Sequence, residues 1–155
     1  MVRSSTIWFM CIVILTLCGV GDASASSIDA AQVHVVDGDT IRVYHDKPDV
    51  RLVGFNAPET GRAQCQKERE LGDQATRRLR ELVRSQPLDF DFVDCACPAG
   101  TEGTPACNYG RSCGVLRVSG KDVGQLLIAE GLAVPFQCGA TRCPKTPRPW
   151  CEQRH

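Results

Sequence analysis

Residues 33–55 read VHVVDGDTIRVYHDKPDVRLVGF, and this stretch decides the fold. Apolar side chains alternate on both sides of the central DGDT turn, at Val33 and Val35 before it and at Ile41 and Val43 after it. Alternation with a period of two is typical of strands that bury one face. We therefore expect a β-hairpin whose tip is the DGDT turn.

A third strand and a helix are expected after the hairpin. Residues 50–55 predict the strand, which ends at Asn56-Ala57-Pro58 because proline presets a turn and restricts the residue before it. Within residues 68–83 apolar side chains recur at helical spacing, at Leu71, Ala75, Leu79 and Leu82. This spacing predicts an amphipathic helix.

The second half of the chain repeats this mixture of strands and helix. Residues 88–92 alternate between apolar and acidic side chains and predict a strand, with residues 114–118 as its partner. Residues 123–130 predict a short helix that Gly131 ends. Short strands, two helices and short connections indicate an α+β, mainly β, fold class.

The first 25 residues have the pattern of a secretory signal peptide. Arg3 precedes an apolar run over residues 7–21, and small residues follow at 23–25. A membrane anchor is the alternative, but the run is shorter than the ~20 residues that span a bilayer. We expect a signal peptide over 1–25, one folded domain over 26–137, a Cys- and Pro-rich tail over 138–155 packed on that domain, and a secreted or periplasmic location.

The chain has ten cysteines, which also bear on its expected location. Two lie in the expected signal peptide, and the others are Cys65, Cys95, Cys97, Cys107, Cys113, Cys138, Cys143 and Cys151. An even number in an exported domain predicts up to four disulfides, whose pairing the sequence leaves open. A zinc site is the alternative for the cysteines near residue 100, but the chain has no CxxC pair or nearby histidine to support it.

The charge balance limits how this chain could bind a polyanion. Its formal net charge is zero, with 18 basic and 18 acidic residues. Attraction by the whole molecule is therefore excluded, and any affinity for nucleic acid must come from local arginines and a bound cation. This balance fits a turnover enzyme better than a tight binder.

Three motifs carry the chemistry: residues 37–40 (DGDT), 51–60 (RLVGFNAPET) and 109–111 (YGR). Arg51 and Arg111 offer planar guanidinium groups that suit phosphate oxygens. The carboxylate of Glu59 is able to orient or deprotonate a water molecule. With oxygen ligands for a hard cation, these are the components of a metal-assisted phosphodiesterase.

The order and spacing of the motifs resemble the thermonuclease family, also called the staphylococcal-nuclease-like family, over roughly residues 30 to 136. The resemblance implies a small five-stranded OB-fold barrel with two to three helices, here stapled by disulfides. It also implies an exported endonuclease that hydrolyses DNA or RNA by in-line attack of water, breaking the bond between the 5′-oxygen and phosphorus.

The resemblance assigns a role to each motif residue. Arg51 and Arg111 would clamp the phosphate, Glu59 would be the base or water-positioning group, and Tyr109 would contact the substrate. For each, the ordinary alternative is structural: a surface ion pair for an arginine, a turn residue for Glu59, and a packed or exposed ring for Tyr109.

A calcium site is implied as well. Asp39, Asn56 and the backbone carbonyl of Ala57 match the metal-contacting positions, and all three offer hard oxygen ligands. The family usually has aspartate where this chain has Asn56, and commonly threonine where it has Ala57. The site therefore carries one negative charge fewer, and we expect weak calcium binding. Asp37 and Thr40 are expected to stabilise the turn.

Two other function classes compete with the nuclease. A non-catalytic OB-fold module could bind nucleic acid or protein, but such a module has no need for Glu59 beside a phosphate. A secreted structural domain held by disulfides is the second. Nucleic acid is the expected partner, no protein partner is implied, and we expect a monomer.

Overall fold

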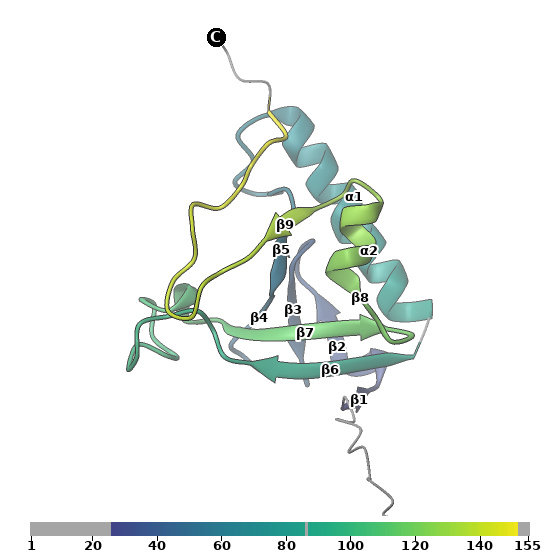
Figure 1. The fold of residues 1–155 in the computed structure, drawn as a ribbon. Helices are drawn as coiled ribbons and strands as arrows, with labels where there is room; N and C mark the ends of the chain where they lie inside the picture. Colours follow the sequence, from purple (N-terminus) through teal and green to yellow (C-terminus); the bar gives the residue numbers. More distant parts are fainter. Residues whose placement is uncertain (1–25, 86, 152–155) are drawn as a thin grey trace, which may run out of the picture.

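A strongly curved mixed sheet forms the body of the computed structural model, which describes residues 26–85 and 87–151. The strands are β1 (Ser27–Ile28), β2 (Val33–Val35), β3 (Thr40–Val43), β4 (Val50–Leu52), β5 (Gly54–Asn56), β6 (Leu88–Val93), β7 (Ser112–Val118), β8 (Lys121–Asp122) and β9 (Val134–Phe136). Their order in the main sheet is β1-β6-β7-β4-β3-β2, with β8 also paired to β7, while β5 and β9 form a separate pair. The result is a nearly closed barrel with two helices, as an OB-fold predicts (Figure 1).

The predicted hairpin is confirmed. Strands β2 and β3 pair antiparallel, with Val33 opposite Val43 and Val35 opposite Ile41. All four side chains are buried in the core. The predicted pairing of the later strands is confirmed too, because β6 runs antiparallel to β7 over its whole length.

The strand expected over residues 50–55 is divided in two. The first part, β4, pairs parallel with β7, whereas β5 leaves the main sheet and pairs with β9. The break falls at Gly54, whose φ of +91° is accessible to glycine at little cost. The single-strand prediction was therefore wrong, because alternation does not reveal a left-handed residue that redirects the chain.

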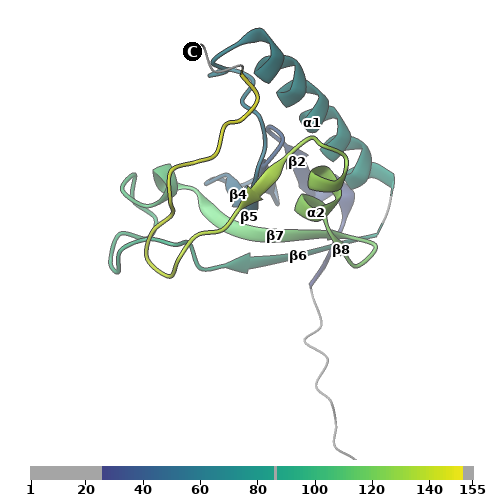
Figure 2. The same ribbon diagram turned by 45° about the horizontal axis from the view of Figure 1, so that its top comes forward.

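Both predicted helices are present. Helix α1 (Gln66–Ser85) extends beyond the predicted range at each end, and α2 (Val123–Ala129) begins where expected. Asp122 caps α2 by accepting a hydrogen bond from the backbone of Gln125. The helices pack beside each other and cover one side of the barrel (Figure 2). No helix in the described part of the chain is long and apolar enough to span a membrane.

Four disulfides hold the outer segments, which confirms the expected number. The pairs are Cys65–Cys151, Cys95–Cys113, Cys97–Cys107 and Cys138–Cys143. All eight cysteines considered for a zinc site or for bridges are thus joined to one another. The expected signal peptide, residues 1–25, lies outside the described residues.

Candidate active site

The tip of the β2–β3 hairpin packs against Ala57, the residue that follows β5, and against α1. A Cβ atom on Gly38 would lie 2.7 Å from the Cβ of Ala57 and 2.9 Å from that of Ala75, so only glycine permits this approach. Asp37 stabilises the turn by accepting a hydrogen bond from the Asp39 backbone, at 3.1 Å. The packing places Asp39 inside the protein, where it is 9% exposed.

The Asp39 carboxylate is held on both oxygens. Oδ1 accepts a hydrogen bond from the Thr40 hydroxyl at 3.1 Å, and Oδ2 accepts one from the Ala57 backbone at 2.9 Å. Arg51 Nη1 lies 2.9 Å from Oδ2. Burial raises the pKa of Asp39 to about 6, although the charge of Arg51 opposes the shift. Asp39 is therefore a desolvated carboxyl group that is paired with Arg51.

The Arg51 guanidinium faces inward, and its side chain is 12% exposed. Nη1 donates to the backbone carbonyls of Asp39 and Leu52, at 3.2 and 2.8 Å, besides its contact with the Asp39 carboxylate. Nη2 donates to the Phe55 carbonyl at 3.0 Å and to Asn56 Oδ1 at 2.9 Å. These five oxygens engage the four N–H groups of the two terminal nitrogens. Asp39, Arg51 and Asn56 thus form one compact group.

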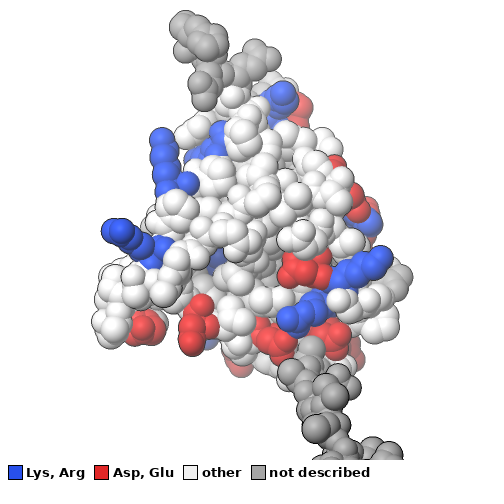
Figure 3. All heavy atoms as spheres, in the orientation of Figure 1, with Lys and Arg blue, Asp and Glu red and all other residues white. Residues whose placement is uncertain are grey.

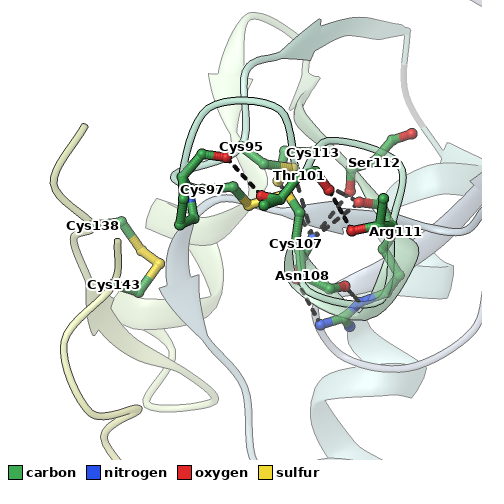
Figure 4. The surroundings of a disulfide bond; sticks show 12 residues. Cys95, Cys97, Thr101, Cys107, Asn108, Arg111, Ser112, Cys113, Cys138 and Cys143 are labelled. Atoms are coloured by element: carbon green, nitrogen blue, oxygen red, sulfur yellow. Dashed lines mark hydrogen bonds between the residues drawn. A yellow bond between two sulfur atoms is a disulfide. The ribbon is translucent and has the colours of Figure 1, made fainter. Parts of the chain in front are cut away.

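Arg111 contacts the same hairpin at Thr40. Its Nη1 donates to Thr40 Oγ1 at 3.2 Å, so Thr40 bridges Arg111 and Asp39. Its Nε and Nη2 donate to the backbone carbonyl and side-chain oxygen of Asn108, at 3.2 and 2.9 Å (Figure 4). These bonds use three of the five N–H groups of Arg111, which leaves donors for a ligand.

A disulfide-bonded loop fixes the position of Arg111. Cys95–Cys113 closes the segment that contains Arg111, and Cys97–Cys107 closes a smaller loop within it (Figure 4). Asn108 occupies a left-handed conformation with φ of +49°, which asparagine tolerates better than most residues. Its amide nitrogen lies 3.5 and 3.4 Å from the carbonyls of Arg111 and Ser112. The loop is therefore built around the Asn108 side chain.

Tyr109 lies at the surface beside Arg111. It is 79% exposed, and its ring centroid is 5.8 Å from the guanidinium carbon of Arg111. The neighbouring Gly110 has φ of +79° and ends the short 3-10 helix Asn108–Gly110. An exposed ring next to a cation is available to a ligand that approaches this side.

Glu59 stands on the segment between β5 and α1. A Cβ on Gly72 would lie 2.7 Å from the Pro58 carbonyl oxygen and 2.9 Å from that of Glu59, so the helix accepts this backbone only at a glycine. The Glu59 side chain is 39% exposed and 4.0 Å from Arg62. The charges of Glu59 and Arg111 both act on the pKa of Arg51, after burial and Asp39. Glu59 therefore lies within electrostatic range of Arg51.

The structure brings together Asp39, Arg51, Asn56 and Ala57 through direct contacts, and Arg111 joins them through Thr40. Sequence reasoning missed three contributors: the bridging role of Thr40, Asn108, and the Pro147 carbonyl, which accepts from Asn56 Nδ2 at 3.1 Å. Only Asn108 has a local signal, as an asparagine in a Gly- and Cys-rich loop directly before the YGR motif.

Oxygen atoms dominate the potential metal ligands. Among the described residues, no three His, Cys, Asp or Glu side chains are grouped so that they could hold a metal ion. The carboxylate of Asp39 and the amide oxygen of Asn56 are hard oxygen atoms of the kind that calcium prefers, and each lies 2.9 Å from a terminal nitrogen of Arg51. Charges of both signs are interspersed at the margins of the face shown in Figure 3, without a single basic field.

Comparisons with known proteins match this chain to nucleases. Residues 49–147 match the family model described as staphylococcal nuclease homologue. The chain is 36% identical over 100 residues to Endonuclease YncB of Bacillus subtilis (strain 168), and 34% identical over 108 residues to the SPbeta prophage-derived endonuclease YokF of that strain. The matched regions are 63% and 68% of this chain, but only 43% and 33% of those proteins.

Proposed function

Because the chain belongs to the staphylococcal nuclease family, we propose that it is a metal-dependent endonuclease that hydrolyses phosphodiester bonds in DNA or RNA. The observation that carries this proposal is the hydrogen-bonded chain from Arg111 through Thr40 and Asp39 to Arg51, with Glu59 within electrostatic range. Two cations and a carboxylate able to activate water are the groups that phosphodiester cleavage needs.

Each residue would have a distinct part in the reaction. Arg111 has N–H groups left to donate to a phosphoryl oxygen, while Arg51 supplies a buried positive charge close by. Glu59 is exposed enough to hold a water molecule for in-line attack on phosphorus, with the 5′-oxygen as the leaving group. Tyr109 would contact the nucleotide beside Arg111.

Calcium is the proposed cofactor. Asp39, the amide oxygen of Asn56 and the carbonyl of Ala57 would hold it, and the buried negative charge of Asp39 supports this assignment. When bound, the ion would stabilise negative charge on the phosphate oxygens. Only one of these ligands is anionic, so binding should be weak, roughly 10⁻⁴–10⁻³ M.

We propose that the protein is exported because it contains disulfides. Four bridges persist in an oxidising compartment, as expected for a secreted or periplasmic protein. Residues 1–25 would then be the signal peptide, 26–137 the nuclease domain and 138–155 its attached tail.

The deciding experiment measures cleavage of single- and double-stranded DNA and of RNA by the oxidised protein, with calcium and with a chelator. Glu59→Gln should lower kcat by ~10²–10³, the usual effect of losing one group that stabilises or activates at a reacting centre. Glu102→Gln, a matched change at an exposed glutamate in the 95–108 loop, should retain full activity. Binding of DNA without cleavage under every condition would instead establish the non-catalytic OB-fold module.

A further inference from the structure

Residues 138–151, here called the C-terminal strap, return from β9 past the 95–108 loop to the N-terminal end of α1, a path visible in Figures 1 and 2. The Cys65–Cys151 disulfide fastens the end of the strap. Arg148 Nε donates to Glu68 Oε1 at 2.8 Å, its Nη2 lies 2.8 Å from the same oxygen, and Glu68 is fully buried. Trp150 is 7% exposed. The strap is therefore packed on the domain as an ordered segment.

Between these anchors the strap contacts the candidate active site at one side chain. Asn56 is 5% exposed and lies between the strap and the arginine of the second motif. Its Nδ2 donates to the Pro147 carbonyl at 3.1 Å, and its Oδ1 accepts from Arg51 Nη2 at 2.9 Å. The Asn56 amide therefore contacts both the Arg51 guanidinium group and Pro147, which lies 91 positions later in the sequence.

Only an amide satisfies both neighbours. The Pro147 carbonyl has no proton and needs a donor, whereas Arg51 needs an acceptor. An aspartate at position 56 would accept from Arg51, but its second oxygen would face the Pro147 carbonyl without a proton between them. A buried acceptor without a donor is unfavourable, so the strap and an aspartate are incompatible at this contact.

We propose that Asn56 is a positioning residue that couples the C-terminal strap to Arg51. The strap fixes which way the amide points, and the amide oxygen then holds Nη2 of Arg51, which sets the orientation of the buried guanidinium group. This inference rests on the proposed function, because it gives a purpose to the orientation of Arg51.

The first experiment does not depend on nuclease activity. Limited trypsin digestion of the full oxidised protein, followed by reduction and mass spectrometry, measures cleavage after Lys145, two residues before Pro147. Cleavage of a folded segment reports the population of its open form. Asn56→Asp should raise this rate about tenfold over wild type, equivalent to roughly 1.4 kcal/mol. Gln125→Glu, the same amide-to-carboxylate change on exposed α2, should leave the rate unchanged.

The second experiment tests the link to Arg51. Wild type nicked after Lys145 keeps its four disulfides, but Pro147 is no longer joined through the backbone to residues 138–145. Its affinity for a single-stranded DNA oligonucleotide, measured in chelator, should fall about fivefold, within the range typical of coupled neighbours. In Asn56→Ala, which starts with lower affinity, the same nick should change nothing further, because the coupling residue is already absent.

The outcomes separate the two proposals. Equal trypsin rates for Asn56→Asp and wild type overturn the strap contact, and equal effects of the nick in wild type and Asn56→Ala overturn the coupling. If both experiments give the expected results but no variant or wild type cleaves DNA or RNA, the coupling stands as a determinant of nucleic-acid binding and the proposed catalytic function fails.

Discussion

Asn108 contacts both Arg111 and the backbone of the loop that carries Arg111. It accepts from Arg111 on two oxygens and holds the loop through its amide nitrogen, all in a left-handed conformation. Asparagine is well suited to both tasks because its short polar side chain bonds locally and tolerates positive φ. The side chain and the backbone conformation can be separated by substitution with glycine.

The first prediction is that Asn108→Gly lowers kcat/KM about tenfold while the loop stays folded. Glycine adopts the same φ without strain, so the loss would come from the missing amide that orients Arg111. Steady-state kinetics on a DNA oligonucleotide measure it. In an Arg111→Ala background the Asn108→Gly change should have no further effect, since residues that act as a unit are non-additive. Additive losses would show that Asn108 does not act through Arg111.

The second prediction concerns the two carboxylates of the hairpin tip. Asp39→Asn removes the anionic member of the proposed calcium set, so the calcium midpoint should rise more than about tenfold. Asp37→Asn is the matched control, because an amide oxygen can still accept the turn hydrogen bond from Asp39. Isothermal titration with calcium measures both. A similar shift in both variants would mean that general charge loss, and not ligation by Asp39, sets the affinity.

At the level of secondary structure, the sequence predicts the elements that repeat a local pattern. The β2–β3 hairpin and α1 follow from alternation at Val33–Val43 and from helical spacing through Leu79. The parallel pairing of β4 with β7 does not follow, because no local signal joins strands about 60 residues apart, and a parallel pair needs a long connection. The resemblance proposes roles for the motif residues, whereas the contacts between the motifs depend on this pairing.

The third prediction concerns the packing of α1 against α2. Arg78 donates to both oxygens of Glu130, at 2.8 to 3.1 Å, and these hydrogen bonds lower the pKa of Glu130. Both side chains are about one third exposed, so solvent weakens the pair to about 0.5–1 kcal/mol. Glu130→Gln should lower the free energy of unfolding by that amount at pH 7.

The pH dependence of this pair has a definite sign. A carboxylate whose folded pKa is depressed stabilises the protein above its unfolded value, here 4.5, and the contribution is lost as pH falls through the lower folded pKa. The difference between wild type and Glu130→Gln in urea denaturation should therefore persist at pH 5 and vanish well below pH 4.5. Glu102→Gln, at an exposed position, should show no difference at either pH.

In the molecule as a whole, the C-terminal strap is joined to the middle of the chain by contacts that the sequence does not predict. Eight cysteines predict four bridges, but the identity of each pair depends on which segments the barrel brings together. Arg148 and Pro147 lie in a proline-rich tail without periodicity, yet they reach Glu68 and Asn56. Long-range contacts of this kind are fixed by the completed fold.

The last prediction ranks the disulfides by the length of chain that each one closes. Cys65–Cys151 spans 86 residues and Cys138–Cys143 spans 5. In the chain-entropy model, a bridge restricts the unfolded state more when its loop is longer, which gives about 4.5 kcal/mol for the first and about 2 kcal/mol for the second. Cys65→Ala/Cys151→Ala should therefore lower the free energy of unfolding by roughly twice as much as Cys138→Ala/Cys143→Ala. Denaturant unfolding of both variants measures the ranking, with near-UV circular dichroism to check that each begins from the native fold. Release of the strap, with its Arg148–Glu68 pair, acts in the same direction. Equal losses, or a larger loss from the short loop, would show that local contacts outweigh loop closure in this domain.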